Sequence, residues 1–265
     1  MNGTFDILRQ KAESATARAH VPYSTQRGAP QRDAAVLLLA DGAWVPGVRV
    51  ESASFSLVIP PLMNAFTTVA AAGRTDVVAA ALNRPFLPEE AAYMRSTPAG
   101  LFREEADDVF VATDADALPP VGDRLDPFLD APTPEHPAEG IALAREVAQR
   151  AHVPESDFRV GCVLVVEGGK LVPGVNVEHA DWSRILCAER NALGTALSWG
   201  LTGLEALYLT CLKDESGSPC GACRQLLAEL APTAAVWMGR GQVSPEAASP
   251  RYLLPGAFHG QALLL

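Results

Sequence analysis

Val45-Pro46-Gly47-Val48 and Val172-Pro173-Gly174-Val175 are the same four residues placed 127 positions apart, and they begin a repeat that decides the fold. Residues 45–73 align without a gap on residues 172–200, with 12 identities in 29 positions. A second match, of residues 18–22 with residues 150–154, has an offset of 132, so about five extra residues lie between Pro22 and Arg32. Two copies are too few for a solenoid, and the repeat predicts an internal duplication of one domain.

Residues 126–137 separate the two copies. They contain four prolines and few apolar side chains, a composition typical of a semi-rigid, extended linker. A loop within one domain is the alternative interpretation, but the repeat restarts directly after this segment. We therefore expect a first domain over residues 1–126, a linker over 127–137 and a second domain over 138–265.

The apolar pattern and the chain breakers predict the same elements in both copies: a helix, two strands joined by a Gly-containing turn, a second helix and two further strands. In the first copy these elements cover about 5–19, 34–40, 44–50, 62–72, 77–82 and 109–112. In the second copy they cover about 138–151, 160–167, 171–177, 185–199, 204–211 and 234–238, with another helical pattern at 224–230. Strands mixed with helices imply a layered α/β fold.

The composition excludes several classes of protein. With 48% hydrophobic residues, 20% charged residues and a net charge of −10, the chain is too apolar for a disordered protein and too acidic to favour a phosphate backbone. No apolar run approaches the roughly 20 residues of a membrane-spanning helix, and residues 1–6 lack the pattern of a signal peptide. We expect neither a nucleic-acid partner nor a membrane contact.

The cysteines all lie in the second copy, at positions 162, 187, 211, 220 and 223. An odd number of cysteines without an export signal argues against a disulfide scaffold. It favours a reducing, cytoplasmic compartment, in which the thiols bind a metal or react.

Three of these thiols form a candidate metal site. Cys220 and Cys223 are three residues apart at the start of a helical pattern, so their sulfurs can reach one ion. This pair alone is equally consistent with a redox pair or half of a structural zinc site. Cys187, also early in a predicted helix, supplies a third ligand and leaves the fourth tetrahedral position open, as in catalytic zinc sites. Cys211 is the candidate fourth ligand of a structural site, but it lies in a predicted strand.

Two charged residues follow Cys187 directly. Glu189 is too close to that cysteine to bind the same ion easily, but its carboxylate can move a proton to and from a zinc-activated water. Zinc with three thiolates carries a net negative charge, and the Arg190 guanidinium can offset it. The alternative interpretations are an exposed helix glutamate and a surface arginine.

The second copy resembles the cytidine deaminase family. The resemblance rests on Phe158-Arg159-Val160-Gly161, Asn176-Val177-Glu178, Cys187-Ala188-Glu189-Arg190, residues 218–225 and residues 253–258, in the family's order. It implies two tandem three-layer α/β/α domains with mixed sheets, and one zinc ion per chain, held by the all-cysteine ligand set of the small homotetrameric enzymes. The chain departs from the family's common pattern at Glu155, His179 and Trp182.

The resemblance also implies roles for further residues. Asn176 and Glu178 would bind the ribose hydroxyls, and Phe158, Ala188 and Phe258 would contact the pyrimidine. The implied reaction is the hydrolytic deamination of cytidine and 2′-deoxycytidine to uridine and 2′-deoxyuridine plus ammonia, as in pyrimidine salvage, with a zinc-bound hydroxide as nucleophile and Glu189 as proton shuttle. The alternatives are a deaminase of another amino-pyrimidine nucleoside such as blasticidin S, a nucleic-acid editing deaminase, and a non-catalytic zinc-stabilised interaction protein.

The first copy has lost this chemistry. Cys187, Glu189 and Arg190 align with Pro60, Leu62 and Met63, and the first copy contains no cysteine. Phe158 aligns with Gln31 and Asn176 with Arg49. We expect a degenerate, non-catalytic domain that is retained for packing. Two chains would then form a homodimer of four domains, in which the degenerate domain completes an active-site pocket of its own chain or of its partner.

Overall fold

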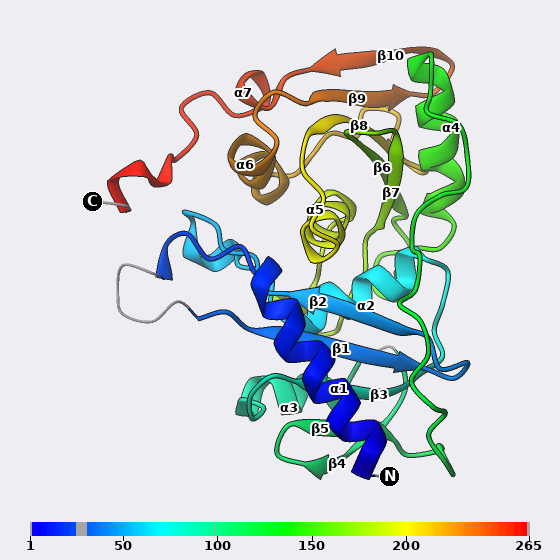
Figure 1. The fold of residues 1–265 in the computed structure, drawn as a ribbon. Helices are drawn as coiled ribbons and strands as arrows, with labels where there is room; N and C mark the ends of the chain where they lie inside the picture. The colour runs from blue at the N-terminus through cyan, green and yellow to red at the C-terminus, as the bar shows by residue number, and fades with distance from the viewer. Residues whose placement is uncertain (1, 25–30, 98, 264–265) are drawn as a thin grey trace.

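The computed structural model describes residues 2–24, 31–97 and 99–263, and it is an α/β protein with one five-stranded sheet in each half (Figure 1). The first half contains α1 (Asn2–Ala15), β1 (Ala34–Leu39), β2 (Trp44–Val48), α2 (Pro61–Ala71), β3 (Val77–Leu82), α3 (Pro88–Met94), β4 (Phe102–Ala106) and β5 (Val109–Ala112). The second contains α4 (Pro137–Ala148), β6 (Val160–Val166), β7 (Lys170–Val175), α5 (Ala188–Ser198), β8 (Leu204–Cys211), α6 (Gly221–Leu230), β9 (Ala235–Arg240), β10 (Val243–Ala248) and α7 (Pro250–Leu253). Single 3-10 turns cover Thr16–Arg18, Phe55–Leu57, Trp182–Arg184 and Gly260–Leu263.

Each sheet is covered by helices on both faces, which explains why its central strands read as continuous apolar runs. In β1, Val36 and Leu38 pack with the helix α1, whereas Leu37 and Leu39 lie in the core that contains α2. This alternation follows from the two-residue period of a strand. In the second half α4 and α5 cover the two faces of β6 in the same way.

The repeated glycine of the Val-Pro-Gly-Val motif brings each second strand against a helix start. A Cβ atom on Gly174 would overlap the carbonyl oxygen of Ala188, the first residue of α5. A Cβ atom on Gly47 would overlap the carbonyl oxygen of Pro61, the first residue of α2. Only glycine allows this close approach, which in the second half fixes the segment that carries Cys187 and Glu189.

The two sheets differ in one respect that corrects the expectation of mixed sheets. The second sheet, of order β10-β9-β8-β6-β7, is mixed, because α6 connects the parallel strands β8 and β9. The first sheet, of order β2-β1-β3-β5-β4, is antiparallel at every pairing of its described strands. There β4 and β5 form a hairpin whose second strand pairs with β3, and a hairpin produces antiparallel neighbours.

Other elements agree with the sequence or add to it. Strands β3, β5 and β8 occupy the predicted ranges, whereas α3, β4, β10 and α7 were not predicted. The first helix ends at Ala15 and continues as a 3-10 turn. The extra residues expected between Pro22 and Arg32 include 25–30, which lie outside the described residues.

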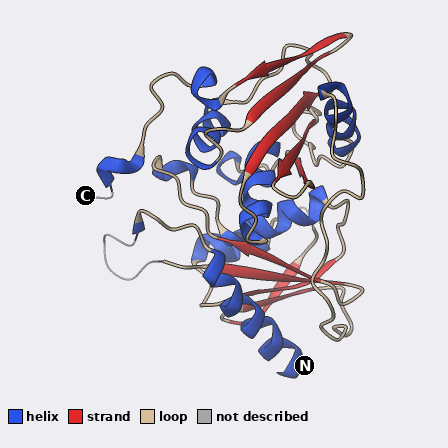
Figure 2. Cartoon of the chain, turned by 45° about the horizontal axis from the view of Figure 1, so that its top comes forward, coloured by secondary structure: helices blue, strands red, loops and turns tan. Residues whose placement is uncertain are grey.

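Helices α2 and α5 pack against each other between the two sheets, and one hydrophobic core contains residues of both halves (Figures 1 and 2). Residues 126–136 form neither helix nor strand. Within them, the Leu129 amide donates to the Leu171 carbonyl at 3.0 Å, and the Phe128 ring lies edge-on to Trp199. The domain bounds remain a prediction. None of the helices in the described ranges is both long and apolar enough to cross a membrane.

Candidate metal centre and active site

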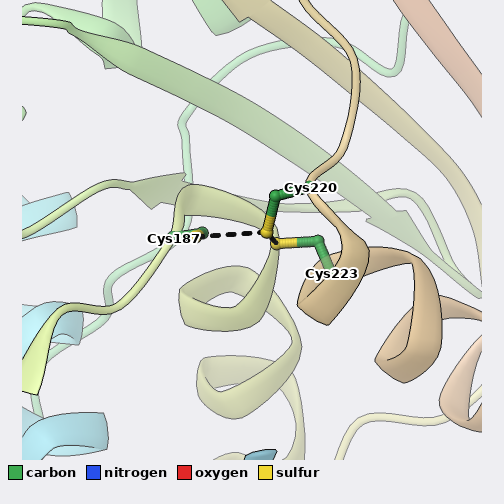
Figure 3. A group of neighbouring side chains, drawn as sticks. All are labelled: Cys187, Cys220 and Cys223. Carbon is green, nitrogen blue, oxygen red and sulfur yellow. Dashed lines mark hydrogen bonds between the residues drawn. The ribbon is translucent and has the colours of Figure 1, made fainter. Parts of the chain in front are cut away.

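The sulfurs of Cys187, Cys220 and Cys223 converge at one point of the second half (Figure 3). Cys187 Sγ lies 3.7 Å from Cys220 Sγ, which lies 3.5 Å from Cys223 Sγ, and all three sulfurs are within 4.8 Å of one another. Cys220 is exposed, Cys187 half-buried and Cys223 buried. The group is therefore open to solvent on one side.

Two helix starts position these sulfurs. Cys187 is the N-cap of α5, Cys220 is the N-cap of α6, and Cys223 lies in the first turn of α6. The positive ends of both helix dipoles stabilise thiolates there. Cys211 does not belong to the group.

The donor set fits zinc. Three cysteine sulfurs at two helix starts offer soft, anionic ligands to a tetrahedral cation, and no fourth His, Cys, Asp or Glu of the described ranges joins the group. The Nε atom of Arg190 is buried and has no hydrogen-bond partner among the described residues, as expected for a cation that balances excess thiolate charge.

Glu189 lies beside the sulfurs, in the first turn of α5 and only 3% exposed. Cys223 Sγ donates a hydrogen bond to its Oε2 at 3.2 Å. Burial raises the pKa of Glu189 to about 7, against the opposing effect of this hydrogen bond and of the nearby Arg190 charge. A carboxyl group with a pKa near neutrality is suited to accept and return a proton.

Arg190 reaches the other half of the chain. Its Nη2 donates to the Leu57 carbonyl oxygen at 3.1 Å, in the first half. No hydrogen bond joins its guanidinium to a sulfur of the group within the described residues. The role of Arg190 in charge balance therefore stays a prediction, supported by its unpaired buried Nε.

Asn176 and Glu178 hold the loop that carries Phe158. Asn176 Oδ1 accepts from the Val160 amide, and its Nδ2 donates to the Phe158 carbonyl, both at 2.9 Å. Glu178 Oε2 accepts from the amides of Glu155 and Ser156 at 3.0 and 3.1 Å, and its Oε1 accepts from the Ser156 hydroxyl. Both side chains are buried and mostly paired within the chain.

The first half repeats this arrangement without the thiols. Glu51, which aligns with Glu178, accepts at Oε2 from the amides of Tyr23 and Ser24, both at 3.0 Å. Since the first copy has no catalytic group to support, the hydrogen bonds that hold this loop have a structural role in both copies.

The three remaining predicted contact residues lie in different environments. Ala188 is fully buried at the start of α5, and Phe158 is half-buried next to Asn176. Phe258 is 51% exposed, and its carbonyl accepts from Gln225 Nε2 at 2.7 Å. Gln225 follows Cys223 by two residues, so the segment with Phe258 is attached to the helix of the thiols.

The sequence did not predict the contacts from α3. Ser96, just after α3, offers both its carbonyl and its hydroxyl oxygen to His179 Nε2 at 3.1 Å. Its hydroxyl also accepts from Arg184 Nη1 at 3.1 Å, and the Tyr93 ring lies 5.9 Å from the His179 ring. The first half thus supports the loop that follows Glu178. Ser96 and His179 are 83 positions apart, and no local signal links them.

Comparison with known proteins gives matches that cover the C-terminal half. The family model for the cytidine and deoxycytidylate deaminase zinc-binding region matches residues 135–239. A protein named cytidine deaminase from Halalkalibacterium halodurans is 38% identical over 119 residues, 44% of this chain and 90% of that protein. Another from Sporosarcina psychrophila is 36% identical over 46% of this chain and 91% of that protein. The crystal structure of cytidine deaminase from Burkholderia pseudomallei matches with 37% identity and a TM-score of 0.44, over 46% of this chain and 98% of that one.

Proposed function

Since this chain belongs to the cytidine deaminase family, we propose that its C-terminal half deaminates cytidine and 2′-deoxycytidine hydrolytically to uridine and 2′-deoxyuridine, with release of ammonia. The single observation that carries the proposal is the convergence of three cysteine sulfurs beside the buried carboxyl of Glu189.

Cys187, Cys220 and Cys223 would hold one zinc ion per chain. When bound there, zinc supplies a Lewis acid that lowers the pKa of a water molecule. Glu189 takes one proton of the attacking water and gives it to ring nitrogen 3. It then takes the second proton from the added hydroxyl group and gives it to the departing amino group, which leaves as ammonia. Burial of Glu189 raises its pKa above the ordinary range of a glutamate, which favours a carboxyl group that holds a proton between the two steps. Arg190 balances the negative charge of the ligand set from the same turn of α5.

The substrate contacts follow from the same loop. Asn176 and Glu178 are two residues apart, just after β7, and each keeps capacity for one more hydrogen bond, through the second N–H of Nδ2 and a further lone pair of Oε1. We assign them to the ribose hydroxyls. Phe158, Ala188 and Phe258 would contact the pyrimidine ring, with Phe258 supplied on the segment that Gln225 holds.

We further propose that two chains associate. Phe55 and Trp182 are equivalent positions of the repeat, and they are 58% and 81% exposed. Large exposed aromatic side chains are typical of contact surfaces. Sedimentation that gives the mass of a single chain at micromolar concentration would contradict the homodimer.

The test is a substrate panel on zinc-quantified protein. We expect about one zinc per chain and loss of cytidine absorbance with stoichiometric ammonia, while blasticidin S and single-stranded DNA remain unchanged. Glu189→Ala should keep zinc and fold and lose turnover by about three orders of magnitude or more. Glu205→Ala, an exposed carboxylate of β8, is the matched control. Equal turnover of Glu189→Ala and its parent would exclude the assigned proton shuttle.

A further inference from the structure

A cavity of nucleoside size lies in the degenerate half. It has a volume of about 320 Å³, and its walls include Tyr23, Ser24, Gln31, Arg49, Glu51 and Ser52. This volume falls within the range of small-molecule sites in proteins.

Three walls of this cavity, Gln31, Arg49 and Glu51, are the repeat equivalents of the proposed substrate contacts Phe158, Asn176 and Glu178. Together with Tyr23, Ser24 and Ser52, they align in order with Glu155, Ser156, Phe158, Asn176, Glu178 and His179. The hydrogen bonds around these residues are also equivalent in the two halves. Glu51 accepts from the amides of Tyr23 and Ser24, as Glu178 accepts from those of Glu155 and Ser156. The duplication has therefore kept the hydrogen bonds that hold this loop in both halves.

This cavity cannot carry out the reaction. Pro60 and Leu62 take the positions of Cys187 and Glu189, and they offer neither a metal ligand nor a proton carrier. A molecule that enters would be bound and released unchanged.

The charges around the cavity select for a neutral ligand. The Arg49 Nε donates to Glu51 Oε1 at 3.3 Å, and no described residue accepts from its two Nη atoms. Glu229 of α6 lies at the edge, where it accepts from the Ser52 hydroxyl and the Ala53 amide, both at 2.8 Å. Among the described residues, two carboxylates lie beside one guanidinium, which disfavours a phosphate, whereas carbonyl and hydroxyl oxygens can accept from the Nη groups of Arg49.

We propose that the first-half cavity binds a neutral pyrimidine nucleoside without turning it over, with Arg49 donating hydrogen bonds to its oxygens. The choice of a nucleoside rests on the function proposed for the second half. The cavity itself is a separate site, at the contact between the degenerate half and helix α6.

Uridine is the probe, because it has no amino group to lose. Equilibrium dialysis of labelled uridine against the zinc-loaded full chain should give two sites per chain, and one site in Arg49→Ala. Losing hydrogen bonds from a charged donor should weaken the first-half site roughly tenfold or more. Arg103→Ala, which removes an exposed arginine paired with Glu105 in the same half, should keep both sites. Thermal unfolding of each variant shows that it is folded, and Arg49→Gln provides a second variant of similar shape.

One uridine per chain in the parent up to about 1 mM would overturn the inference. So would two sites in a folded Arg49→Ala or Arg49→Gln protein, or binding of uridine 5′-monophosphate at the Arg49-dependent site as tight as that of uridine. A separate assay tests the proposed function: if the parent protein releases no ammonia from cytidine, that function is wrong, whatever the uridine-binding result.

Discussion

The hydroxyl oxygens of Thr68 and Thr195 lie 2.7 Å apart, and these two residues occupy the same position in the two copies of the repeat. A contact between equivalent residues places them at an approximate two-fold axis, as in an isologous interface between subunits. The helices α2 and α5 cross there. The chain therefore packs its two halves as a symmetric dimer would pack two subunits.

Other contacts between the two halves also involve equivalent residues of the repeat. Asn64 Nδ2 donates to the Gly194 carbonyl at 3.2 Å, and the equivalent Asn191 Nδ2 donates to Thr67 Oγ1 at 3.1 Å. A Cβ atom on Gly73 would lie 3.6 Å from the Arg150 side chain, and one on Gly200 would lie 3.5 Å from that of the equivalent Arg18. Several identical residues of the repeat, among them Asn64, Thr68 and Gly73, thus lie where each half meets the other, which explains why the degenerate copy keeps them.

The first prediction concerns the contact on the axis. Thr68→Val and Thr195→Val should each lower the free energy of unfolding by about 1–2 kcal/mol, because each leaves a buried hydroxyl without its partner. The double variant should lose less than the sum by at least about 0.5 kcal/mol. Urea denaturation measures the cycle, and Thr113→Val on the surface is the control. Strict additivity would show that the two hydroxyls do not interact.

The sequence predicts most of the fold for physical reasons that are local. Continuous apolar runs mark β1 and β6, and Val-Pro-Gly-Val marks the strands that approach a helix start. The sequence does not predict the order of β4 and β5 in the sheet. Both strands are short, and which of them pairs with β3 depends on how the chain returns after α3. Pairing partners are a non-local property, and no residue pattern in 102–112 specifies them.

In the candidate site, too, the sequence predicts local features and misses contacts between distant residues. Spacing identified Cys220 and Cys223 as a pair that can reach one ion, and the position of Cys187 early in a predicted helix added a third sulfur, which the structure places in the same group. Ser96 was missed because its contact with His179 crosses from one copy to the other. The loop tether by Glu178 was missed because a carboxylate that accepts backbone amides leaves no mark in the sequence of its partners.

The second prediction separates ligand thiols from the other cysteines. Cys220→Ser should reduce the zinc content of purified protein from about one per chain to well below half, because a neutral hydroxyl is a weak zinc ligand. Cys211→Ser removes a thiol of the same half that stands outside the group, and it should keep zinc and cytidine turnover. Metal analysis after gel filtration measures both. Equal zinc content in the two variants would contradict the three-sulfur site.

The third prediction tests the support that the first half gives to the active-site loop. Ser96→Ala removes the hydroxyl that contacts His179 and Arg184, and it should raise KM for cytidine by roughly threefold to tenfold with kcat nearly unchanged. Ser14→Ala is a matched control, because Ser14 Oγ also donates to the carbonyl four residues earlier and lies in α1. A fall in kcat at constant KM would show that Ser96 acts on the chemical step instead.

The last prediction uses the repeat as its own control. Glu178→Gln and Glu51→Gln each weaken a buried carboxylate tether of two amides, so each should cost about 1–3 kcal/mol of unfolding free energy. Only Glu178→Gln should also raise KM for cytidine, by about tenfold or more, because only Glu178 and the loop it holds are assigned to the substrate. Chemical denaturation and initial rates are measured on the same samples. If both variants raise KM equally, the effect is transmitted through the shared core, and the assignment of Glu178 to the ribose fails. If Glu178→Gln raises KM without loss of stability, its carboxylate binds substrate and the loop tether is dispensable.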